Sequence, residues 1–75
     1  MTLNACVLVK TKPAASDAVL SQLRKLKGVR KAYVVYGRFD LVAFIEGADY
    51  PALRQLTGVV NAIEAVRSTE TLAEA

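Results

Sequence analysis

The sequence predicts an α+β domain of the ferredoxin-like class, in which a four-stranded antiparallel sheet carries two helices on one face. Four short runs of β-branched and aromatic residues alternate with two longer stretches whose apolar residues recur at helical spacing. The predicted order is therefore strand, helix, strand, strand, helix, strand. The apolar positions of the first half also recur at a constant offset in the second half, as expected of two βαβ units: Val19, Leu23, Leu26 and Val29 match Leu56, Val60, Ile63 and Val66.

The first strand is predicted over residues 3–9, which are mostly apolar, and Pro13 ends it. Ser16 is the expected N-cap of the first helix, because its hydroxyl can accept a hydrogen bond from a free backbone N–H of the first turn. Asp17 suits the positive end of that helix. Gly28 is placed to stop the helix.

The central hairpin is predicted from two strands, residues 29–36 and 40–46, which are rich in β-branched and aromatic residues. Between them, Gly37 to Asp40 are expected to form a tight turn. Glycine supplies the positive φ that such a turn often requires, and aspartate can bond local backbone or present a carboxylate at the sheet rim.

Asp49 is the expected cap of the second helix, Pro51 is tolerated in its first turn, and Leu53, Leu56, Val60 and Ile63 form its apolar stripe. The last strand is expected over residues 66–72, and the few residues after it are expected to be frayed. Strand alternation places three residues on one face of this strand: Arg67, Thr69 and Thr71.

The 75 residues are expected to form a single domain, 1–75, with one core. A domain of this size buries only about 60% of the surface that its unfolded chain exposes. The hydrophobic content of 53% is high for so small a monomer. Both sheet faces carry apolar residues, and the helices can cover only one. We therefore expect a homodimer, built sheet to sheet or edge to edge, as the unit of a larger ring.

The composition argues against an enzyme and against a metal or cofactor site. The chain has no histidine, no close pair of carboxylates, no glycine-rich phosphate loop and a single cysteine, Cys6, which is expected to be buried. It has no apolar run long enough to span a membrane and no signal-peptide pattern, so a cytoplasmic location without membrane contact is expected.

The net charge of +3 arises from ten Lys and Arg against seven Asp and Glu, with a local basic cluster at Arg24, Lys25, Lys27, Arg30 and Lys31. Because cations collect at helix C-termini, a solvated helix end is favoured over a nucleic-acid footprint. Single-stranded RNA binding stays open as an alternative, since Tyr33, Tyr36 and Phe44 are placed on middle strands. Core or interface packing is the favoured role of these rings.

The best candidate site is a small-molecule site at a subunit interface. Asp40 suits an ammonium group, and the backbone N–H groups around Gly37 and Arg38 suit a carboxylate. Thr69 and Thr71 add hydroxyls at strand spacing. Together these groups would suit an α-amino acid. The alternative is that Asp40 only stabilises its turn and that both threonines are ordinary strand residues.

Two segments resemble the effector-binding domain of the Lrp/AsnC transcription regulators: Tyr36-Gly37-Arg38-Phe39-Asp40-Leu41-Val42 is similar to the family's hairpin motif, and Val66-Arg67-Ser68-Thr69-Glu70-Thr71 to its closing strand. The resemblance covers nearly the whole chain. It implies dimers that assemble into octamers or other rings, with an amino acid or related effector bound between dimers. Gly37, Arg38 and Asp40 would then meet the effector's polar end, and Thr69 and Thr71 would come from a neighbouring subunit.

The chain departs from the full-length regulators because no helix-turn-helix precedes the first strand, so direct DNA binding by this chain is not expected. Three explanations fit: a stand-alone effector-binding protein, a modulator that joins rings of full-length relatives, or an assembly module without a ligand. The first is our prediction, and a purely structural oligomerisation module is the runner-up.

Overall fold

The computed structural model describes residues 2–73, and its helices and strands follow the predicted order. The expected fraying concerns the end of the chain, where residues 74–75 lie outside the described part. The six elements are β1 (Leu3–Thr11), α1 (Ser16–Lys25), β2 (Val29–Val34), β3 (Leu41–Gly47), α2 (Tyr50–Asn61) and β4 (Val66–Ala73).

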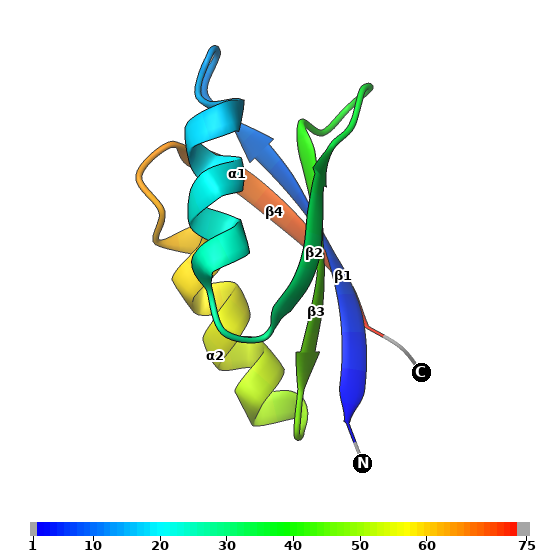
Figure 1. The fold of residues 1–75 in the computed structure, drawn as a ribbon. Helices are drawn as coiled ribbons and strands as arrows, with labels where there is room; N and C mark the ends of the chain where they lie inside the picture. Colours follow the sequence, from blue (N-terminus) through cyan, green and yellow to red (C-terminus); the bar gives the residue numbers. More distant parts are fainter. Residues whose placement is uncertain (1, 74–75) are drawn as a thin grey trace.

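The four strands form one sheet in the order β2-β3-β1-β4, with every neighbouring pair antiparallel. Both helices pack on the same face of this sheet, and the other face carries no helix (Figure 1). The ferredoxin-like α+β prediction is confirmed. Because β1 and β3 are central, β2 and β4 form the two edges.

The core lies between the sheet and the two helices. Along β1, Ala5, Val7 and Val9 are buried, whereas the alternate side chains point to the opposite face, as the two-residue period of a strand requires. Helix α1 contributes Val19 and Leu23 to the core, and α2 contributes Leu53 and Val60. These residues belong to the apolar stripes read from the sequence.

The two helix starts differ from each other. Asp49 caps α2 as predicted, because its Oδ1 accepts a hydrogen bond of 2.9 Å from the backbone N–H of Ala52. The prediction that Ser16 caps α1 is wrong. Ala15 occupies the N-cap position without a side-chain bond, and the Ser16 hydroxyl lies 3.1 Å from the Thr11 hydroxyl instead.

The connection between β2 and β3 is longer than predicted. The strands end at Val34 and resume at Leu41, so residues 35–40 form a six-residue loop rather than a tight turn. Its base is closed by the backbone N–H of Val35, which donates to the carbonyl of Asp40 at 2.9 Å. Gly37 has a φ of 123°, so the predicted need for positive φ is confirmed.

The segment after α1 turns sharply into the edge strand β2. The helix ends at Lys25, and Gly28 reverses the chain with a φ of 97°. The Arg24 guanidinium donates two hydrogen bonds, of 3.2 and 2.8 Å, to the carbonyl of Ala32 on β2. The end of α1 is therefore fixed to the edge of the sheet.

Candidate functional site

Asp40 is bonded to the end of β1. Its Oδ2 accepts a hydrogen bond of 2.8 Å from the backbone N–H of Thr11, while its own N–H donates to the carbonyl of Val9 at 2.9 Å. Pairing between β1 and β4 shifts register between Lys10 and Thr11, because β4 advances two residues, from Ser68 to Val66, while β1 advances one. The Asp40 carboxylate thus accepts the hydrogen bond of the Thr11 N–H just before β3 begins, where no β3 carbonyl is available.

The two candidate threonines lie on the helix side of the edge strand β4. Thr69 pairs with Val9 and Thr71 with Val7, and directly opposed residues of antiparallel strands share a face. The Thr69 hydroxyl donates to Oδ1 of Asn61 at 2.7 Å, which connects β4 to the end of α2. Thr71 is exposed.

One hollow joins the two predicted segments. This loop pocket has a volume of about 520 Å³ and is lined by six residues: Lys10, Arg38, Phe39, Ser68, Thr69 and Glu70. Of the five candidate residues, it brings together Arg38 and Thr69, whereas Gly37, Asp40 and Thr71 are not among its lining residues. Lys10 donates from Nζ to the carbonyl of Arg38 at 3.5 Å.

Of the lining residues outside the hairpin motif, the reasoning from sequence missed Lys10, Ser68 and Glu70. Strand alternation sets Ser68 and Glu70 apart from the threonines, but only the register across the sheet reveals their neighbours. Lys10 pairs with Ser68, and Leu8 pairs with Glu70. All three missed residues therefore lie on the helix-free side of the sheet, where the loop pocket opens.

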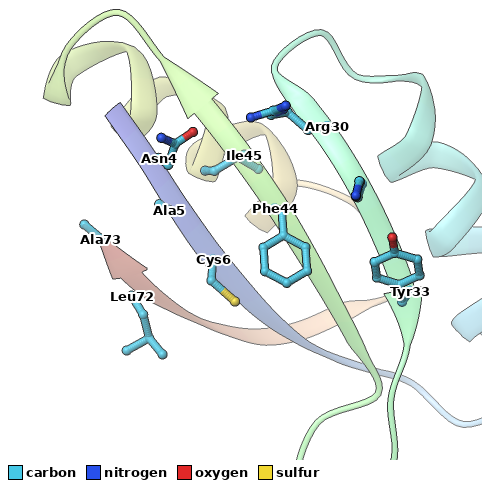
Figure 2. Close-up of a pocket in the computed structure, with 10 residues that line it drawn as sticks. Asn4, Ala5, Cys6, Arg30, Tyr33, Phe44, Ile45, Leu72 and Ala73 are labelled. Carbon is cyan, nitrogen blue, oxygen red and sulfur yellow. The ribbon is translucent and has the colours of Figure 1, made fainter. Parts of the chain in front are cut away.

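The helix-free side carries an apolar surface, which we call the open face and define by Cys6, Leu8, Tyr33, Phe44 and Leu72. Tyr33, Phe44 and Leu72 are exposed over 44%, 43% and 56% of their surfaces. Figure 2 shows Cys6, Phe44, Tyr33 and Leu72 on neighbouring strands of this side. Large apolar patches of this kind mark interaction surfaces.

A second hollow of about 630 Å³ lies on the open face, with Arg30 and Lys31 also among its lining residues. The rings of Tyr33 and Phe44 meet edge to face, with centroids 6.3 Å apart. Burial raises the pKa of the Cys6 thiol, which is half-buried rather than fully buried as predicted.

Within residues 2–73, no three or more His, Cys, Asp or Glu side chains gather where they could hold a metal ion. Neither α1 nor α2 is long and apolar enough to cross a membrane.

Comparison with known proteins identifies the family. Residues 4–73 match the family model described as the Lrp/AsnC ligand binding domain. Among curated proteins, no sequence matches this chain closely enough to count as a relative.

Several solved structures share the fold. FFRP-DM1 is 27% identical, with a TM-score of 0.92, and the alignment covers 97% of this chain and 99% of that protein. TTHA0845 from Thermus thermophilus is 30% identical, with a TM-score of 0.92 and coverages of 97% and 92%. The transcriptional regulator NMB0573 from Neisseria meningitidis, solved as a complex with L-Met, is 16% identical with a TM-score of 0.85.

The alignment with the Neisseria regulator covers 97% of this chain but 49% of the regulator, so the chain spans about half of that protein. At this identity the likeness concerns the fold. The family model, in contrast, matches the sequence itself over nearly its whole length. The chain belongs to the Lrp/AsnC ligand-binding domain family.

Proposed function

We propose that this domain binds a small-molecule effector, an amino acid, and regulates through the assembly of its own copies or their association with full-length regulators of the family. The observation that carries the proposal is the loop pocket, which is lined by both Arg38 of the β2–β3 loop and Thr69 of β4. These residues come from the two segments that resemble the family's motifs. Membership of a ligand-binding family gives independent support.

The five candidate residues take different roles in this proposal. The Arg38 guanidinium and the backbone around Gly37 receive the effector's carboxylate. The hydroxyls of Thr69 and Thr71 lie on the helix side of β4, so in this proposal they contribute to the site of a neighbouring subunit and not to the loop pocket of their own chain. Asp40 either pairs with the effector's ammonium group or holds the strand end against which the pocket forms. Its bond to Thr11 favours the second role.

The proposed assembly uses two surfaces of the helix-free side, the open face and the loop pocket. Two copies pack through their open faces as a homodimer, and dimers meet around the loop pockets to form an octamer or another ring. An effector bound at that boundary stabilises the ring only if it binds the assembled form better than separated dimers.

The proposal is tested by a thermal-shift screen of the twenty amino acids, with assembly mass measured by light scattering with and without each hit. We expect at least one amino acid to raise the melting temperature and to change the mass of the assembly. If none raises it, the domain is a structural oligomerisation module instead.

The role of Asp40 is tested by comparing the affinity of a hit for Asp40→Asn and Asp40→Ala. Asparagine keeps an oxygen acceptor for the Thr11 N–H but removes the charge. If both variants lose affinity by about tenfold or more, the Asp40 carboxylate pairs with the effector's ammonium group. If only Asp40→Asn keeps the wild-type affinity, Asp40 positions the strand end through its bond to the Thr11 N–H. Asp49→Asn, which alters a helix cap instead, is the matched control.

Single-stranded RNA binding is a second candidate, and the observation that favours it is the exposure of Tyr33 and Phe44 on adjacent strands. Aromatic rings on a sheet surface can stack bases, with Arg30 and Lys31 near the phosphates. Their edge-to-face contact suits packing against another apolar surface. Binding to single strands that falls steeply with added salt would favour RNA.

A further inference from the structure

The loop pocket carries more positive than negative charge. Lys10 and Arg38 contribute two cations and Glu70 contributes one anion, while the remaining lining residues are uncharged. The nearby carboxylate of Asp40 is not among the lining groups, and its Oδ2 is bonded to the backbone of Thr11. A ligand with one more negative than positive charge would match this lining.

The three charged side chains come from three separate segments. Lys10 lies on β1 and Glu70 on β4, and the register makes them diagonal neighbours on the same face, with Cα atoms on the order of 7–8 Å apart. Arg38 comes from the β2–β3 loop, and the bond from Lys10 Nζ to the Arg38 carbonyl brings the lysine to that loop. The fold therefore surrounds one small space with a cation, an anion and a second cation.

From this arrangement we infer that the effector is an acidic amino acid, which carries two carboxylates and one ammonium group. The Arg38 guanidinium binds the α-carboxylate through paired N–H donors, Lys10 binds the side-chain carboxylate, and Glu70 accepts from the ammonium group. This inference rests on the proposed function, because it names the effector class of the same pocket. A cover of neighbouring subunits strengthens these contacts, since all three charged residues are exposed in a single chain.

The test compares each acidic amino acid with its amide of nearly the same shape: L-glutamate with L-glutamine, and L-aspartate with L-asparagine. Calorimetry on the assembled protein should give at least one acid an affinity about tenfold or more above that of its amide. Equal affinities, or a preference for the amides, would overturn the inference.

Variants assign the two carboxylates and the ammonium group. Lys10→Gln should bring the ratio of the affinities for acid and amide close to one. Glu70→Gln should weaken the binding of acid and amide by the same factor, because both ligands carry the ammonium group. N-acetyl-L-glutamate, which lacks that group, should bind wild type more weakly than glutamate. Lys12→Gln removes an exposed charge outside the pocket lining and should leave the preference unchanged.

The outcome separates this inference from the proposed function. If a neutral or basic amino acid binds and the acidic ones do not, the domain remains an effector-binding protein and the charge assignment is wrong. If none of the twenty binds, the proposed function fails and the inference fails with it.

Discussion

Asp40 illustrates how one side chain can take the place of missing backbone. Strand β3 begins at Leu41, so no β3 carbonyl faces the N–H of Thr11, and the Asp40 carboxylate accepts from it instead. Thr11 is only 5% exposed, so water cannot easily replace that acceptor. The aspartate of the hairpin motif therefore has a structural role in this chain, whatever it contributes to binding.

We expect Asp40→Ala to lower the free energy of unfolding by about 1–3 kcal/mol, because it leaves a buried N–H without its partner. Asp40→Asn should cost less, since the amide oxygen can still accept. Urea denaturation of both variants provides the measurement. Equal stability of Asp40→Ala and wild type would show that the bond from Thr11 does not stabilise the fold.

Cys6 provides a second prediction for a single residue. Burial raises the pKa of its thiol, so less of it is thiolate at neutral pH than in a free cysteine. Iodoacetamide should react more slowly with Cys6 than it does with the thiol of glutathione. The pH–rate profile of Cys6 should be displaced to higher pH than that of glutathione. The urea-unfolded protein is the control and should react like the free thiol. A folded protein that reacts as fast as glutathione would contradict this prediction.

Among the connections between elements, the turns at Gly28 and Gly37 differ in how much space they leave for a side chain. Gly37 has positive φ, but a Cβ added there would meet only open space. At Gly28, in contrast, an added Cβ would lie 2.8 Å from Cδ2 of Leu56 and 3.2 Å from the carbonyl oxygen of Glu46. A side chain at position 28 would therefore combine backbone strain with a steric clash, whereas at position 37 it would bring the strain alone.

Gly37→Ala should lower the free energy of unfolding by about 1–3 kcal/mol, and Gly28→Ala should lower it by more. Gly58→Ala is the matched control. It lies inside α2 with nothing within 4 Å, so alanine should raise stability by about 0.5–1 kcal/mol. Chemical denaturation gives the order of the three variants, and a Gly37→Ala protein less stable than Gly28→Ala would contradict the steric argument.

The elements also show which features were predictable from sequence. Strand alternation, helical spacing and the Asp49 cap are local, so the fold and the start of α2 could be read directly. The Ser16 prediction failed because the hydroxyl has a partner on β1, Thr11. Local patterns do not reveal the pairing between strands that are distant in the sequence. This pairing sets the length of the β2–β3 loop and brings Lys10 and Glu70 together in the lining of the loop pocket.

At the scale of the whole molecule, the exposed apolar side chains of the open face affect stability. A domain this small gains little from its own core, and Tyr33, Phe44 and Leu72 leave further apolar surface exposed. A second copy packed on this face would remove that surface from water. The melting temperature should then rise with protein concentration, because association stabilises only the folded chain.

Phe44→Glu places a charge on the open face and should reduce the mass measured by light scattering, because the contact between copies through this face is lost. It should also remove the dependence of melting temperature on concentration. Tyr50→Glu changes an aromatic residue that is 55% exposed but lies at the start of α2, and it should leave the mass unchanged. If Phe44→Glu keeps the wild-type mass, the copies do not meet through this face.

The hydrogen bonds from Arg24 to the carbonyl of Ala32 affect how readily the protein aggregates at high concentration. An edge strand with free carbonyls is a template onto which other chains can add, and this is a common start of aggregation. On β2 the Arg24 guanidinium occupies one of those carbonyls, and the lysines and arginines nearby repel an equally basic copy. Both features disfavour open-ended addition of chains at the β2 edge and leave association through the open face as the favoured contact between copies.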